Sequence, residues 1–124
     1  MLGLYLLAST LSYYPNYLGY FNEIVWNRLE AYKYLADSNL DWGQDDIVLE
    51  RYRKKHPDLI EVPQKPDIIN ETRLYYESSN NIVGVTSVPD DYKWIRENFQ
   101  PISRIGTSYL LYKITPEEMK TFCN

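Results

Sequence analysis

The sequence is poor in the residues that build covalent or metal cross-links. It holds one cysteine, Cys123, and one histidine, His56, among 124 residues. A single cysteine excludes a disulfide-stapled scaffold and a multi-cysteine zinc site. His56 follows a predicted helix C-terminus, where a cation suits the helix dipole, so no role as a general base is assigned to it.

A basic excess is also missing. Thirteen Lys and Arg residues stand against seventeen Asp and Glu residues, which gives a formal net charge of -4. A protein that binds nucleic acid by displacing counterions from phosphates needs a basic surface. The composition therefore predicts no nucleic-acid partner.

The sequence also lacks a long hydrophobic run. Residues 1–11 are apolar, but no Lys or Arg precedes Arg28, and Pro15 follows soon after the run ends. A cleavable signal peptide needs a basic start, and a membrane span needs about 20 apolar residues. The spacing favours a helix buried in the core. A second interpretation is that residues 1–13 form a membrane-proximal helix stub, since the helix is apolar all round.

What the chain does contain is typical of a folded domain. It is 44% hydrophobic, with thirteen Tyr and three Trp residues, which excludes a disordered acidic tail. No internal repeat, low-complexity tract or Gly/Ser linker divides it. A chain of this length can bury a core without help from a metal. We therefore expect one soluble domain over residues 1–124.

Periodicity and stop signals predict the elements. Helices are expected over residues 2–13, 17–26, 42–55 and 90–98, and a short terminal helix is expected from the Thr115 capping box with Pro116 at its first position. Strands are expected over residues 32–36, 58–62, 73–77, 82–88 and 104–114, the last in the centre. The fold class is α/β (or α+β), with a mixed sheet of about four or five strands and helices 42–55 and 90–98 packed on it.

The segment from Asp37 to Asp46 concentrates polar chemistry between a predicted strand and a predicted helix. In α/β sheets, the loop after a strand is where ligands usually bind. The candidate ligand-binding residues are Asp37, Asn39, Asp41, Trp42, Gln44 and Asp45. No catalytic residue, no metal site and no cofactor is assigned.

Three interpretations of this segment stay open. The carboxylate spacing resembles a calcium loop, but an EF-hand that starts at Asp37 would need Gly and Glu where Trp42 and Val48 stand. A purely structural interpretation gives the segment Asx-turns and makes Asp41 a helix cap. The third is sugar recognition, with Trp42 as a stacking plate.

Asp45 carries a specific expectation. It shares a helical face with Leu49 and Tyr52, so it should be partly buried and must find hydrogen-bond donors. We expect these donors to be the Trp42 indole, local backbone amides or a tyrosine hydroxyl. Asp46, on the solvent flank, should matter little.

Four segments carry a family resemblance. Residues 34–45 read YLADSNLDWGQD, residues 14–23 read YPNYLGYFNE and residues 92–95 read YKWI. The fourth segment begins with PISRIG at residues 101–106 and continues to Ile114. In this order they resemble the C-terminal part of bacterial integral-membrane glycosyltransferases, which are similar to the dolichyl-phosphate-mannose–protein mannosyltransferases of the GT-C superfamily. The chain departs from the family pattern at residues 25–27, over residues 61–81, and at Thr107, where the family commonly has Tyr.

The resemblance implies an extracytoplasmic place, periplasmic or at the cell surface. Such enzymes move a sugar from a polyprenyl-phosphate donor, and their catalytic acid follows the first membrane helix, a part with no counterpart here. The chain then resembles a soluble accessory domain that packs on the membrane-embedded part of a glycosyltransferase, or binds or positions acceptor, glycan or lipid-linked sugar. The alternative is a free-standing metal- or sugar-binding module, or a small enzyme, that uses the Asp37–Asp45 loop.

Overall fold

A four-stranded mixed sheet forms the centre of the fold, in the order β1-β2-β4-β3. The computed structural model describes residues 1–12, 14, 27–35 and 43–123. Its strands are β1 (Leu59–Glu61), β2 (Arg73–Ser78), β3 (Ser103–Ile105) and β4 (Tyr109–Ile114). β1 runs parallel to β2, and the other two pairs are antiparallel. The mixed sheet and the α+β class confirm the prediction from the sequence.

The two faces of the sheet are separated by the alternation of side chains along β2 and β4. Tyr75 and Tyr112 pair across the strands and enter one apolar cluster, whereas Tyr76 and Leu111 pair and enter the other. β4 is buried on both faces, as expected for a strand with neighbours on each side and cover above and below.

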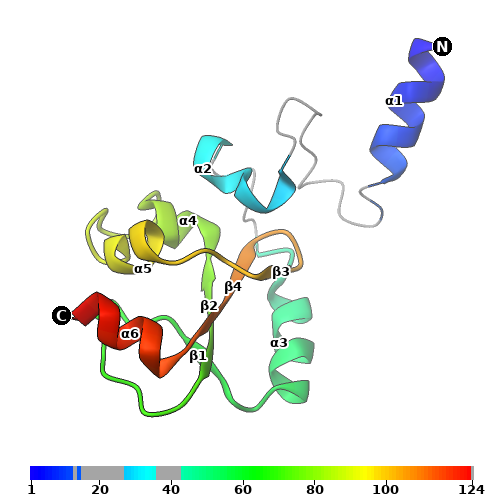
Figure 1. The fold of residues 1–124 in the computed structure, drawn as a ribbon. Helices are drawn as coiled ribbons and strands as arrows, with labels where there is room; N and C mark the ends of the chain where they lie inside the picture. The colour runs from blue at the N-terminus through cyan, green and yellow to red at the C-terminus, as the bar shows by residue number, and fades with distance from the viewer. Residues whose placement is uncertain (13, 15–26, 36–42, 124) are drawn as a thin grey trace.

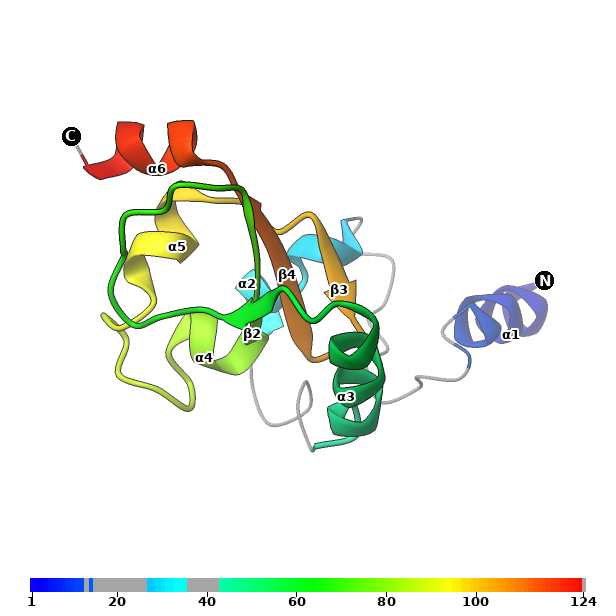
Figure 2. The same ribbon diagram turned by 90° about the horizontal axis from the view of Figure 1, so that it is seen from below.

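Helices cover each face of the sheet (Figures 1 and 2). α3 (Asp46–Lys55) packs Leu49 and Tyr52 against one face. The other face is covered by side chains from four short helices, α2 (Tyr32–Leu35), α4 (Ser79–Val83), α5 (Lys93–Asn98) and α6 (Pro116–Cys123). The predicted packing of helices 42–55 and 90–98 on the sheet is therefore confirmed in outline, although α3 begins at Asp46 and α5 at Lys93.

α1 (Leu2–Leu11) lies away from the sheet in both views (Figures 1 and 2). Its side chains are exposed except for Ser9; Leu4 and Leu7 are 70% and 57% exposed. The helix itself was predicted, but its burial in the core was not confirmed: the favoured interpretation of a core helix is wrong. Among the residues that the structure describes, no helix is long and apolar enough to cross a membrane.

Two predicted strands are helices instead. Residues 32–35 form the short helix α2, with Tyr32 buried in the core, in place of the predicted strand. The strand expected over residues 82–88 is replaced by α4 and a turn, in which Gly84 ends the helix at φ +81. A Cβ at Gly84 would lie 2.8 Å from Pro89 Cα, so only glycine fits this close turn.

The long strand expected over residues 104–114 is a hairpin. β3 and β4 pair antiparallel on either side of a turn at Gly106, whose φ is +63. The expected strands over residues 58–62 and 73–77 are confirmed as β1 and β2. The helix expected over residues 17–26, and the start of the next one at Asp41 and Trp42, lie outside the described residues.

The capping box at the start of α6 has the expected form. The Thr115 N–H and hydroxyl donate to Glu118 Oε2 at 2.9 and 3.0 Å, and the Glu118 N–H donates to Thr115 Oγ1 at 3.3 Å. These bonds satisfy amides that the first helical turn leaves unpaired.

We therefore expect Thr115→Ala to lower the free energy of unfolding by about 1 kcal/mol in urea denaturation. Thr121→Ala is the matched control, since the Thr121 hydroxyl only donates to the Glu117 carbonyl on the exposed side of the same helix. An equal loss in both variants would contradict a special role of the cap.

Candidate functional site

The buried carboxyl group of Asp45 joins the start of α3 to the β3–β4 turn. Asp45 is 1% exposed and is the N-cap residue of α3. Its Oδ2 accepts from the Thr107 N–H and hydroxyl at 2.6 and 2.9 Å, and from the Ser108 N–H and hydroxyl at 2.8 and 2.9 Å. Gln44 adds a bond from its Nε2 to Ser108 Oγ at 3.0 Å. Burial of Asp45 and its place at a sheet end are thus confirmed.

The donors differ from those expected. They come from a turn 62 and 63 residues later in the chain, not from backbone amides near Asp45 or a tyrosine. The one tyrosine hydroxyl that reaches this helix start, that of Tyr109, donates to the exposed Asp46 at 2.7 Å. The Trp42 indole lies outside the described residues, as do Asp37, Asn39 and Asp41.

Gly106 allows the carboxyl group to approach the turn so closely. A Cβ built at Gly106 would overlap the carboxyl carbon and oxygens of Asp45, and its positive φ also favours glycine. The turn then continues into a second contact, because the Ser108 carbonyl accepts from the Ser79 N–H and hydroxyl, each at 2.8 Å. One turn therefore connects α3, the hairpin and the first residue of α4.

This geometry gives Asp45 a structural role. Four donors on one oxygen hold the carboxyl group in place, whereas a general base needs an oxygen directed at a reacting proton. No group of three or more metal-ligating side chains occurs within the described residues. Of the six candidate ligand-binding residues, the structure brings Gln44 and Asp45 together on the turn, and ligand binding by the loop stays a prediction.

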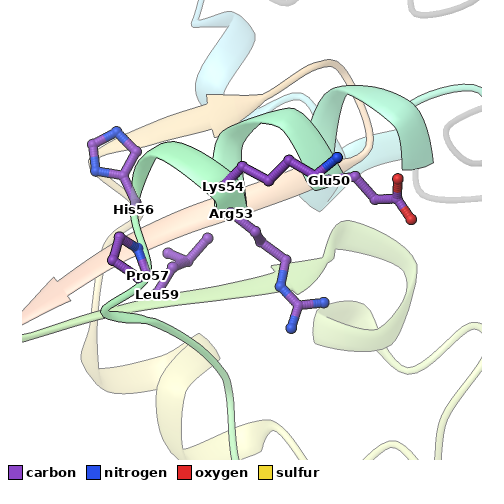
Figure 3. A pocket seen from close by; sticks show the side chains of 6 residues that line it. All are labelled: Glu50, Arg53, Lys54, His56, Pro57 and Leu59. Atoms are coloured by element: carbon purple, nitrogen blue, oxygen red, sulfur yellow. The ribbon is translucent and has the colours of Figure 1, made fainter.

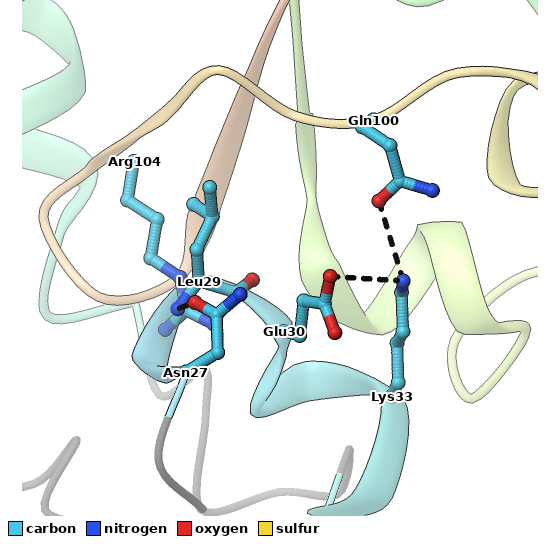
Figure 4. A network of polar contacts seen from close by, with 6 residues as sticks. All are labelled: Asn27, Leu29, Glu30, Lys33, Gln100 and Arg104. Carbon is cyan, nitrogen blue, oxygen red and sulfur yellow. Dashed lines mark hydrogen bonds and ion pairs between the residues drawn. The ribbon is translucent and has the colours of Figure 1, made fainter.

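The segment that precedes the loop is fixed by a second polar network (Figure 4). Lys33 donates to Gln100 Oε1 at 3.3 Å and forms an ion pair with Glu30 at 3.7 Å. Arg104 donates to the Leu29 carbonyl at 3.3 Å from β3. These contacts hold η2 (Arg28–Glu30) and α2 against the hairpin. Residues before the loop therefore contact Gln100 and β3, and Asp45 after the loop contacts the β3–β4 turn.

A second buried carboxyl group, that of Glu77, was missed by the sequence analysis. Glu77 is 3% exposed at the end of β2, where Oε1 accepts from the Ser78 N–H at 2.7 Å and from Asn81 Nδ2 at 2.9 Å. Within the part of the chain that the structure describes, Oε2 has no partner with hydrogen-bond geometry. The sequence did contain a signal for this burial. Glu77 stands two positions after the buried Tyr75, so both side chains point to the same face of β2.

Burial raises the pKa of Glu77 above its ordinary value, and the bonds from Asn81 and Ser78 offset part of that rise. Burial and the neighbouring Glu77 also raise the pKa of Tyr92 to about 12. The pKa of Tyr112 is raised as well, mainly by burial and then by Tyr32. Each phenol therefore stays neutral, and the buried cluster disfavours negative charge.

A surface hollow at the C-terminal end of α3 is the third feature, and it too was missed (Figure 3). Its volume is about 500 Å³, and it is lined by Glu50, Arg53, Lys54, His56, Pro57 and Leu59. The His56 ring stacks on Tyr52 with centroids 4.3 Å apart. From the sequence, the positive charge at this helix end was explained only by its favourable interaction with the helix dipole.

Comparison of the chain with protein-family models, with curated proteins and with solved structures found no match. The site must therefore be interpreted from its own chemistry.

Removal of the Asp45 carboxyl group should leave four buried or half-buried donors without their acceptor. We expect Asp45→Ala to lower the free energy of unfolding by roughly 1–3 kcal/mol. Asp46→Ala, which loses one exposed bond from Tyr109, should cost under about 1 kcal/mol. Urea denaturation of both variants tests this. Equal, negligible effects would contradict the buried network, and a calcium-dependent rise in melting temperature would favour a metal-organised loop.

Glu77 should make stability depend on pH. Because its pKa is raised in the folded state, its contribution is fully present below the ordinary value of 4.5 and is lost as the pH rises through the raised value. The side chain in Glu77→Gln cannot ionise, so this loss should disappear. Melting temperatures from about pH 4 to about pH 8 should fall with pH more steeply for the natural chain than for the variant. Parallel curves would contradict the raised pKa.

Proposed function

We propose that the chain is an extracytoplasmic accessory domain of a polyprenyl-phosphate-sugar-dependent membrane glycosyltransferase. The observation that carries this proposal is α1, an apolar helix whose side chains are exposed on all sides but for Ser9. Large exposed apolar surfaces on a folded protein mark a contact with a partner or a membrane.

The chemistry of α1 fits hydrocarbon better than a membrane surface. The helix contains no charged residue. Its neighbouring hydroxyls are bound to the backbone: Thr10 donates to the Leu6 carbonyl at 2.8 Å, and Ser12 to the Ser9 carbonyl at 2.6 Å. A helix that lies in the interface needs a polar face, and α1 has none. An apolar helix with satisfied hydroxyls is compatible with lipid on every side.

The placement of the family-like segments supports the same proposal. The segment of residues 34–45 ends at Asp45, and the segment that begins at Pro101 contains the turn whose donors bind Asp45. Residues 92–95 contribute the buried Trp94 and Ile95 to the core. Part of the resemblance, at Asp45, Trp94 and Ile95, therefore falls on residues that are buried in the fold.

The proposed role is non-catalytic. None of the 124 residues matches the catalytic loop of the family, and Asp45 is held by structural bonds. The domain would pack on the membrane-embedded part of the enzyme and bind or position acceptor, glycan or lipid-linked sugar. Sugar transfer by the purified chain alone would contradict this role.

The genomic sequence that precedes the codon for Met1 is the direct test. The proposal expects an open reading frame there that encodes several membrane helices in continuity with this chain. A frame without such helices would contradict it.

Membrane attachment through α1 is testable on the chain itself. We expect the chain to sediment with neutral phosphatidylcholine vesicles, and Leu4→Glu/Leu7→Glu to weaken this binding by more than about tenfold, since each buried leucine contributes roughly 2 kcal/mol. The melting temperature should not change, because both side chains are exposed in the fold.

Val85→Glu/Val88→Glu is the matched control. These valines are 51% and 61% exposed on the loop between α4 and α5, so the double variant adds the same charges away from α1. Equal weakening in both variants, or a natural chain that remains in the supernatant, would contradict attachment through α1.

A further inference from the structure

The last two turns of α3 carry a dense positive charge in a chain of negative net charge. Arg51, Arg53, Lys54 and Lys55 supply four of the thirteen Lys and Arg residues, and the net charge is -4. Arg53 and Lys54 line the hollow of about 500 Å³ beside the helix end, together with His56. This volume lies within the range of small-ligand sites, about 300–1,000 Å³.

This charge is not balanced within the fold. The only ion pair between residues that the structure describes joins Lys33 to Glu30, on another element. A helix C-terminus is equivalent to roughly half a negative charge, which is less than the charge of one lysine. Arg51 and Lys55 stand four positions apart on the helix, where like charges repel. A local excess of positive charge therefore remains beside the hollow, and it favours an anion.

Hydrogen-bond donors and apolar side chains both line the hollow. Figure 3 shows Arg53 and Lys54 extending in different directions from the helix, with Leu59 and Pro57 near the helix end. The Arg53 guanidinium carbon lies 5.7 Å from the centroid of the Tyr76 ring, which limits its motion.

Two more residues shape the hollow. Stacking on Tyr52 fixes the His56 ring. Glu50 is the one acid that lines the hollow, and it lies at the end away from His56 (Figure 3). The Arg53 side chain extends away from His56 in Figure 3, so these two residues line different parts of the hollow.

We propose that this hollow binds a phosphate group, as a soluble phosphomonoester or diphosphate or as a lipid headgroup. A planar guanidinium donates two parallel bonds to phosphate oxygens, and a lysine ammonium adds a mobile point charge. Arg53 and Lys54 provide one of each, and His56 also lines the hollow. This inference does not depend on the proposed function, because it rests on α3 alone.

The test is a titration of the complete chain with inorganic phosphate and with pyrophosphate, followed by amide chemical shifts. We expect saturable shifts centred on residues 50–59. Arg53→Gln/Lys54→Gln should weaken binding by about tenfold or more, because two charge-assisted contacts are lost.

Arg51→Gln/Lys55→Gln is the matched control, because it removes the same charge from the same helix at residues that do not line the hollow. It should change affinity less than about twofold, as expected for screened surface charges. Equal weakening by both double variants would overturn the site in favour of diffuse attraction.

A second arm separates the two sources of phosphate. The chain is sedimented with neutral phosphatidylcholine vesicles and with vesicles that contain phosphatidylglycerol. Because α1 contacts both kinds, only the increment on anionic vesicles reports the hollow. An increment lost in Arg53→Gln/Lys54→Gln identifies a headgroup, and saturable shifts without it identify a soluble phosphate. Absence of both effects would overturn the proposal.

Discussion

The bond between Asp45 and the β3–β4 turn is the contact on which the rest of the arrangement depends. Through it, the N-cap residue of α3 is fixed on the hairpin, and the Ser108 carbonyl accepts from Ser79 at the start of α4. α3 covers one face of the sheet and α4 the other. Because both helix starts are held by one turn, loss of this contact would loosen both layers at the same end of the sheet.

The backbone supplies half of this contact, so half of it does not depend on which side chains the turn carries. Two of the four donors to Asp45 are the N–H groups of Thr107 and Ser108, which any residue except proline provides. A residue with another side chain in place of Thr107 would therefore retain the backbone bond. The contact requires glycine at position 106, since a side chain there would occupy the space of the Asp45 carboxyl group.

The sequence predicts the elements with strong local signals. The apolar face of α3 placed Asp45 inward, and the Thr115 capping box located the start of α6. It could not predict the donors to Asp45, because they lie in a turn more than sixty residues away and periodicity contains no information about that distance. The strand predicted over residues 82–88 is wrong for a related reason. Their β-branched composition favours a strand. In the fold, however, Ser79 donates to the Ser108 carbonyl and Gly84 ends a helix. Tertiary contacts overrode local propensity.

The buried polar residues of the domain collect at one end of the sheet, where β2 ends and β4 begins. Apart from Ser9 in α1, the buried polar residues are Asp45, Glu77, Ser78, Ser79, Asn80 and Ser108. The carboxyl group of Asp45 meets four donors, whereas that of Glu77 has one oxygen unpartnered. Burial of polar groups with incomplete partners costs stability, and proteins retain such groups where function requires them. Gln44, the neighbour of Asp45, donates to Ser108 Oγ at this same end. The carboxyl group with the most donors, that of Asp45, and the less satisfied one, that of Glu77, therefore lie at the same end of the sheet, where hydrogen bonds from one turn hold the starts of α3 and α4.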